Sequence, residues 1–79
     1  MSAVAGYVLI QAKVGGAAHV AHAALSIDGV DSAEAIDGPY DVVVSAHAPS
    51  NDELGRLVVG HLQCIRGITR TVTCTVVNI

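Results

Sequence analysis

The residues best suited to binding chemistry lie at the middle of the sequence, in the segment Asp37-Gly38-Pro39-Tyr40-Asp41. An Asp-Gly pair between two strand-like runs predicts a hairpin, because glycine accepts the positive φ that tight turns require. Pro39 fixes its own φ and lacks an N–H, which stiffens the turn. Tyr40 and Asp41 then place an aromatic ring beside a carboxylate. Two interpretations follow: a ligand-binding turn, or a plain hairpin whose tyrosine packs and whose aspartate is solvated.

The four histidines are the other candidates for chemistry. His19 and His22 are three residues apart on the polar face of a predicted helix, close enough to share a metal ion. No cysteine or carboxylate completes a set nearby, so we interpret both as solvated and expect no metal site. His61 falls on the apolar stripe of a second helix and is expected to be a hydrogen-bonded histidine of the core or its rim. His47 lies on a predicted strand and is a candidate for a dimer interface.

The composition narrows the classes of function. Residues 1–79 make one domain, with a formal net charge of −3 and only four Lys or Arg residues. Nucleic-acid binding needs a basic patch, so we expect no direct contact with DNA. No apolar run is long enough to span a membrane, and the first ten residues lack the basic segment of a secretory signal, which predicts a soluble cytoplasmic protein. In that compartment Cys64 and Cys74 are expected to be reduced, as half-buried thiols.

Six secondary-structure elements are needed to position these residues. Their predicted ranges are 5–14, 30–37, 40–48 and 68–79 for the strands, and 17–27 and 50–66 for the helices. Ser50 and Glu53 predict a capping box at the start of the second helix, each side chain reaching the backbone N–H of the other residue. Gly29 and Gly67 follow the two helices, where a left-handed glycine commonly ends a helix.

A weak internal repeat organises these elements. Ile27-Asp28-Gly29-Val30 matches Ile65-Arg66-Gly67-Ile68 in residue type, and each half contains a strand, a helix, a glycine stop and a strand. Two right-handed βαβ crossovers joined by the central hairpin give the order β-α-β-β-α-β. The predicted fold is therefore an α+β, ferredoxin-like sandwich: a four-stranded antiparallel sheet of order 4-1-3-2 with two helices on one face.

The uncovered face of that sheet predicts a dimer. The first and third strands contain continuous apolar runs, Tyr7-Val8-Leu9-Ile10 and Val42-Val43-Val44. A solvated sheet face would instead alternate hydrophobic and polar residues. The core also lacks Phe and Trp and is built from small side chains, so a partner subunit is the expected supplement. The simplest cover is a second copy of the chain in a twofold dimer.

Three stretches of the chain resemble the Lrp/AsnC family. They are Gly38-x-Tyr40-Asp41 at the central hairpin, Gly29-Val30 before the second strand, and Ile65-x-Gly67-Ile68-x-Arg70-Thr71-x-Thr73 at the end. Over nearly its whole length the chain is similar to the C-terminal effector domain of that family, the RAM domain (regulation of amino acid metabolism). The N-terminal helix-turn-helix domain of the family has no counterpart in these 79 residues, so the chain resembles the stand-alone RAM proteins.

The resemblance implies a regulatory domain rather than an enzyme. It implies sheet-to-sheet dimers, rings of four dimers, and a small effector, commonly an amino acid, bound between dimers. It also implies an influence on transcription through assembly with full-length Lrp/AsnC regulators. Carried over residue by residue, the ligand-binding positions are Gly38, Pro39, Tyr40 and Asp41, with Thr71 and Thr73 as additional candidates.

The residues agree with an amino acid as the effector. Backbone N–H groups of a turn can hold its carboxylate, and Asp41 can hold its ammonium by a charge-assisted hydrogen bond. Pro39 has no N–H to donate, so a family contact through that group would be missing here. The resemblance implies no cofactor.

A catalytic protein is the main alternative, and a purely structural oligomer is a third. Dimeric ferredoxin-like domains also form cofactor-free monooxygenases and isomerases, which line a pocket between sheet and helices with aromatic and acid–base groups. Phe and Trp are absent here, and no Ser/His/Asp or Cys/His set can be recognised by spacing. The sequence therefore favours a binding domain.

Overall fold

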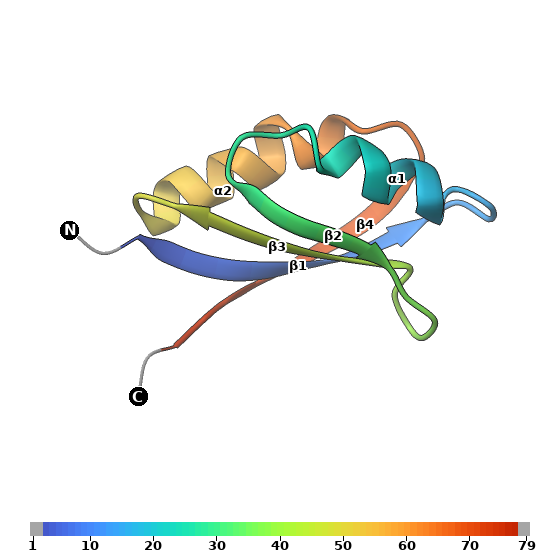
Figure 1. Cartoon of the computed structure of the whole chain (residues 1–79), viewed down its shortest axis with the longest axis horizontal. Helices are drawn as coiled ribbons and strands as arrows, with labels where there is room; N and C mark the ends of the chain where they lie inside the picture. The colour runs from blue at the N-terminus through green and yellow to red at the C-terminus, as the bar shows by residue number, and fades with distance from the viewer. Residues whose placement is uncertain (1–2, 78–79) are drawn as a thin grey trace.

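The computed structural model describes residues 3–77 and shows a single sheet with both helices on one side (Figure 1). The strands are β1 (Val4–Ala12), β2 (Val30–Ala35), β3 (Val42–Ala48) and β4 (Ile68–Thr75), and the helices are α1 (Ala17–Ala24), α2 (Asn51–Gly60) and the short 3-10 helix η1 (Leu62–Cys64). Neighbouring strands are antiparallel in the order β2-β3-β1-β4. This confirms the predicted ferredoxin-like fold and its strand order.

Three strands, β1, β2 and β4, end earlier than the sequence predicts, and β3 begins later, at Val42. β1 stops at Ala12, beside a register shift between Gln11 and Ala12 in its pairing with β4. The next residue, Lys13, donates its N–H to the carbonyl of Gly67 (2.8 Å), which draws it away from the ladder. β4 stops at Thr75, and the end of its predicted range, at residues 78–79, lies outside the described residues.

The second helix is interrupted where the sequence predicts continuity. α2 ends at Gly60 because His61 has φ −126° and ψ −57°, outside the helical range, and the glycines at positions 55 and 60 lower the helical propensity of the segment. Leu62 is fully buried after the break, whereas His61 is exposed. The placement of His61 on the inward stripe is therefore wrong. Within residues 3–77 no helix has the length and apolar character needed to cross a membrane.

The start of α2 shows half of the predicted capping box. The hydroxyl of Ser50 accepts a hydrogen bond from the N–H of Glu53 (3.2 Å), which satisfies one of the free donors at the helix start. The carboxylate of Glu53 does not return the contact, because it pairs with Arg56 one turn along the helix (3.0 Å).

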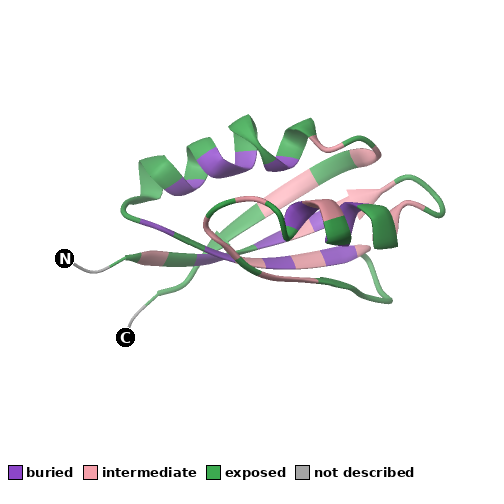
Figure 2. Cartoon of the chain, turned by 45° about the horizontal axis from the view of Figure 1, so that its top comes forward, coloured by how far each residue is buried: buried purple, intermediate pink, exposed green. Residues whose placement is uncertain are grey.

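The core lies between the helices and the face of the sheet beneath them (Figure 2). Every second residue of β1 and β3 is buried, as are the inward stripes of the helices. These residues are Val8, Ile10, Val20, Ala21, Ala24, Val42, Val44, Ala46, Ala48, Leu54, Leu57, Val58 and Leu62. All are aliphatic, and no polar or charged residue is buried within residues 3–77. The helical spacing of apolar residues therefore marks the inward stripes of the helices, whereas β1 and β3 carry continuous apolar runs and only the structure shows which of their faces is buried.

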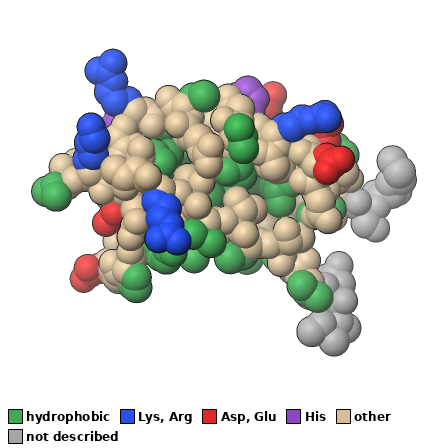
Figure 3. All heavy atoms as spheres, turned by 180° about the vertical axis from the view of Figure 1, so that it is seen from behind, with side chains coloured by type: hydrophobic (Ala, Val, Ile, Leu, Met, Phe, Trp, Pro, Cys, Tyr) green, Lys and Arg blue, Asp and Glu red, His purple; other side chains and the backbone are tan. Residues whose placement is uncertain are grey.

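No helix covers the opposite face of the sheet. Leu9 on β1 pairs with Val43 of β3 on one side and with Val72 of β4 on the other, which gives an apolar row across three strands. Tyr7, two residues before Leu9, is 50% exposed. Seen from behind, hydrophobic side chains show in the middle and along the lower margin of the molecule, the side on which the sheet lies (Figure 3). This surface, termed here the open face, matches the expectation that the central strands are apolar on both sides.

The cysteines differ from the prediction in their exposure. Cys64 and Cys74 are both free thiols, but both are exposed rather than half-buried. Cys64 follows the break after α2, where its Sγ donates to the carbonyl of Gly60 (3.3 Å). Cys74 pairs with Tyr7 across β1 and β4 and so lies on the open face.

Candidate functional site

The segment 36–41 is a loop rather than the tight two-residue hairpin that Asp37-Gly38 predicts. Within residues 3–77 positive φ occurs at Gly15, Gly29 and Gly67, and not at Gly38. A Cβ added at Gly38 would meet no heavy atom within 4 Å. The prediction of a positive φ there is wrong, because the longer loop reverses the chain gradually and no single residue has to adopt a left-handed conformation.

Asp41 anchors this loop to β1. Its backbone N–H donates to the carbonyl of Ile10 and its carbonyl accepts from Ile36, both at 2.8 Å. Its carboxylate Oδ2 accepts from the N–H of Ala12, also at 2.8 Å. Ala12 lies at the register shift between β1 and β4, so its N–H needs an acceptor outside the ladder. The predicted ligand carboxylate is thus also a structural acceptor, and Oδ1 is the oxygen without a partner among the described residues.

The rest of the loop offers hydrogen-bond donors beside a partly buried ring. The side chain of Gln11 donates to the carbonyl of Pro39 (3.1 Å), which holds the loop against the end of β1. Gly38 and Pro39 are exposed, and Tyr40 is partly buried. The backbone N–H groups of Gly38 and Tyr40 form no hydrogen bond within residues 3–77. The loop can therefore present N–H donors and one carboxylate oxygen to a small zwitterion.

Thr71 and Thr73 lie apart from this loop within one chain. Thr71 pairs with the buried residue Ile10, so both threonines are on the helix-covered side of β4. The hydroxyl of Thr71 accepts from the side chain of Gln63 in η1 (2.8 Å). The carbonyl of Ile10 accepts from the N–H of Asp41, so β1 lies between Thr71 and the end of the loop. Within residues 3–77 no hydrogen bond joins either threonine to residues 38–41.

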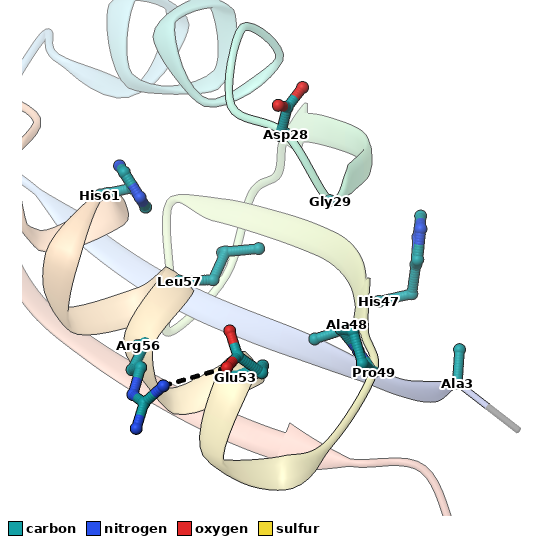
Figure 4. A pocket seen from close by; sticks show the side chains of 10 residues that line it. All are labelled: Ala3, Asp28, Gly29, His47, Ala48, Pro49, Glu53, Arg56, Leu57 and His61. Atoms are coloured by element: carbon teal, nitrogen blue, oxygen red, sulfur yellow. Dashed lines mark hydrogen bonds and ion pairs between the residues drawn. The ribbon is translucent and has the colours of Figure 1, made fainter. Parts of the chain in front are cut away.

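A concave pocket of about 620 Å³ lies at the other end of the sheet (Figure 4). Its lining comes from the start of β1, the turn before β2, the end of β3 and one side of α2. The lining residues are Ala3, Asp28, Gly29, His47, Ala48, Pro49, Glu53, Arg56, Leu57 and His61. We call it the α2 pocket. Sequence analysis missed it because these segments are far apart in the chain and share no motif.

The α2 pocket occupies the place between sheet and helices where the alternative, catalytic interpretation would put an active site. It offers acid–base groups in Asp28, Glu53 and His61. No Tyr, Phe or Trp lines it, and within residues 3–77 no hydrogen bond joins His61 to a carboxylate. The pairing of a base with an orienting acid, by which a catalytic histidine is commonly recognised, is therefore not formed here.

The other histidines lie on exposed surfaces. Nδ1 of His47 is 2.9 Å from both carboxylate oxygens of Asp31, and the two side chains are 53% and 50% exposed. His47 faces away from the core on β3, on the same face as Val43 and Ser45, and its place in a dimer interface stays a prediction. His19 and His22 are exposed on α1. Within residues 3–77, no group of three or more His, Cys, Asp or Glu side chains is placed to hold a metal ion.

Comparisons with known proteins give a single family. The family model of the Lrp/AsnC ligand binding domain matches residues 6–79. No curated protein sequence matches the chain. Among solved structures, TTHA0845 from Thermus thermophilus is similar with a TM-score of 0.89 and 22% identity, covering 96% of this chain and 95% of that one.

Two further similar structures belong to longer proteins. E. coli AsnC matches with a TM-score of 0.87 and 22% identity over 96% of this chain and 52% of its own. The transcriptional regulator NMB0573 from Neisseria meningitidis, solved in complex with L-Met, matches with a TM-score of 0.82 and 16% identity over 95% of this chain and 50% of its own. The chain thus spans about half the length of these two regulators, and at such identities they support the fold.

Proposed function

Because the chain belongs to the Lrp/AsnC family, through its ligand-binding domain, we propose that it is a regulatory domain that binds a free amino acid and catalyses no reaction. The family match covers residues 6–79. One structural neighbour, NMB0573, is a transcriptional regulator solved with L-Met. We infer that this chain likewise binds an amino acid in the cytoplasm and influences transcription through the proteins with which it assembles.

The loop over residues 36–41 is the proposed binding site, and the observation that supports it is the half-used carboxylate of Asp41. One oxygen of Asp41 is held by Ala12 (2.8 Å), which fixes the side chain in place. The second oxygen then accepts the ammonium of the effector in a charge-assisted hydrogen bond. The N–H groups of Gly38 and Tyr40 hold the effector carboxylate, with Pro39 and the ring of Tyr40 forming the wall of the site.

Assembly completes this proposed site. A twofold dimer buries the apolar row of Leu9, Val43 and Val72 on the open face, and four such dimers form a ring. Thr71 and Thr73 lie across β1 from Asp41 and form no hydrogen bond with the loop within residues 3–77, so they reach the effector from a neighbouring copy. Full-length Lrp/AsnC regulators are the proposed partners in mixed assemblies, because they share the domain that forms these contacts.

Calorimetry against each standard amino acid, one at a time, tests the proposal. At least one should bind the parent protein, and Asp41→Asn should weaken that binding roughly ten- to a hundredfold, or about 1.5–3 kcal/mol. The fold should survive, because the amide oxygen of asparagine can still accept from the N–H of Ala12. Asp37→Asn removes the same charge from an exposed position in the same loop and should bind like the parent.

Two results would contradict the proposal. If no standard amino acid binds the parent assembly, the effector class is wrong. If Asp41→Asn binds as tightly as the parent, or if Asp37→Asn weakens binding equally, the loop is only a connection between strands and the site lies elsewhere.

A further inference from the structure

The α2 pocket is a concave feature of the described residues that the proposed effector site leaves unused. It lies beyond the first residue of β1, whereas the loop over residues 36–41 contacts the last residues of that strand. Its volume of about 620 Å³ is within the range of small-molecule sites. An effector bound at the loop over residues 36–41 cannot occupy the α2 pocket, so any ligand of the α2 pocket is a second one.

The floor of the α2 pocket is apolar and tightly packed. Leu57 and Ala48 are only 7% and 5% exposed. The carbonyl of Gly29 accepts from the N–H of His47 (2.8 Å), which joins the turn before β2 to the end of β3. A Cβ at position 29 would lie 2.6 Å from Cδ1 of Leu57, so the turn already sits directly against the floor. The floor of the pocket is therefore fixed by packed backbone and the buried side chain of Leu57.

The charged side chains in the walls above this floor are the carboxylates of Asp28 and Glu53 and the guanidinium of Arg56. In Figure 4, Asp28 stands on one side of Leu57 and Glu53 on the other, while Arg56 points away from the space between them. Arg56 engages Oε1 of Glu53 (3.0 Å), and Oε2 has no partner within residues 3–77. Asp28 forms no ion pair with any described residue. Above Leu57 the pocket thus offers negatively charged acceptors over a hydrophobic surface.

The charged walls and the apolar floor of the α2 pocket together determine which class of ligand fits it. Within the described chain the acidic and histidine side chains form no group of three suited to a metal ion. An anion, or the carboxylate of an amino acid, would face Asp28 and Oε2 of Glu53 without a free arginine among the described lining residues to receive it, because Arg56 is already paired with Glu53. An organic cation matches both features, because its charged end meets the carboxylates and its carbon skeleton covers Leu57.

We propose that the α2 pocket binds a small primary amine with a short branched apolar body, such as an amino acid that has lost its carboxylate. The ammonium lies between the carboxylates of Asp28 and Glu53, and the apolar body lies on Leu57. This second site differs from the effector site in rejecting a carboxylate, so the protein distinguishes an amino acid from the corresponding amine by the end of the sheet at which each binds.

A matched pair of probes tests the discrimination. 3-Methylbutylamine and L-leucine carry the same branched carbon skeleton and differ only in the carboxylate. The amine should bind with a Kd of about 1 mM, as expected for so few atoms, and should shift the backbone amide NMR signals of Gly29 and Leu57 but not that of Gly38. L-Leucine should leave the signals of Gly29 and Leu57 unchanged, whether or not it binds at the loop.

Charge-neutral variants identify the groups that hold the amine. Asp28→Asn and Glu53→Gln should each weaken amine binding about three- to tenfold, because both carboxylates are solvent-accessible, and the double variant should abolish it. Asp52→Asn is the matched control, since it removes a carboxylate from the same first turn of α2 outside the α2 pocket. It should bind the amine like the parent, and thermal melts should show that every variant folds.

Three outcomes would overturn the proposal. The signals of Gly29 and Leu57 would not respond to the amine up to about 10 mM, L-leucine would shift them as strongly as the amine does, or Asp52→Asn would weaken binding as much as Asp28→Asn. None of these results depends on whether an amino acid binds at the loop over residues 36–41, so the two proposals succeed or fail separately.

Discussion

Alanine substitutions at Gly29 and Gly67 test how the fold uses two glycines that occupy matching positions in the two halves of the sequence. Gly29 has φ 95° and Gly67 has φ 100°. In this region the Cβ of an L-residue crowds its own backbone, which costs about 1–2 kcal/mol. Both substitutions therefore share this penalty, and any difference between them must come from the surroundings.

The atoms around Gly29 are much closer than those around Gly67. At Gly29 a new Cβ would lie 2.6 Å from Cδ1 of Leu57 and 2.9 Å from the carbonyl oxygen of His47. That oxygen belongs to the β3 backbone and cannot retreat, so overpacking adds about 1–3 kcal/mol. At Gly67 the nearest atom is Cγ2 of Val20 at 3.8 Å, an ordinary contact. We expect Gly29→Ala to lower the free energy of unfolding by about 2–5 kcal/mol, and Gly67→Ala by about 1–2 kcal/mol.

Urea denaturation at one fixed protein concentration measures this difference, because the stability of an oligomer depends on concentration. The slope of the unfolding free energy against urea concentration should be the same for the parent and the variants, while the midpoint of the transition shifts. Gly38→Ala is the control: its φ is not positive and the added Cβ meets nothing within 4 Å, so stability should be unchanged or rise by less than about 1 kcal/mol. Equal losses for Gly29→Ala and Gly67→Ala would refute the steric argument, and a large loss for Gly38→Ala would refute the loop conformation.

Two further predictions concern assembly and DNA. Light scattering should show the parent protein as a dimer or larger assembly at micromolar concentration, and Leu9→Asp should dissociate or unfold it by burying a charge at the interface. Val59→Asp, on the exposed side of α2 (63% exposed), is the control and should leave assembly intact. A parent protein found only as the 8.0 kDa monomer would contradict the dimer. With a net charge of −3, the 79-residue chain should not retard duplex DNA at physiological salt, so a salt-sensitive mobility shift at micromolar protein would contradict its acidic, non-DNA-binding character.

The fold was predictable because its signals are local. The helical spacing of Val20, Ala21 and Ala24 is contained within one segment, and the structure buries those residues. Boundaries were less predictable because they depend on competing contacts. The apolar spacing of α2 continues to Leu62, yet the chain leaves the helix at His61 and still buries Leu62 by entering η1.

The candidate site was predictable only in part. The sequence located a turn at Asp37-Gly38-Pro39 and began the next strand at Tyr40, whereas in the structure the loop extends over residues 36–41 and β3 begins at Val42. The sequence did not show that Asp41 already accepts from Ala12 (2.8 Å), because that bond depends on a register shift between β1 and β4 that leaves no mark in the residue types. It also did not reveal the α2 pocket, whose walls meet only after both halves of the chain have folded onto one sheet.

The sequence alone therefore determined the order of the elements and the family to which the chain belongs, because periodicity and short motifs act within neighbouring residues. The tertiary structure decided what each conspicuous residue touches. Gly29 and Gly67 occupy equivalent positions in the repeat and both adopt positive φ, yet only Gly29 is packed against Leu57 and the β3 backbone. Local sequence requires a glycine at both positions for its backbone conformation, whereas the cost of a side chain there is set by segments distant in the chain.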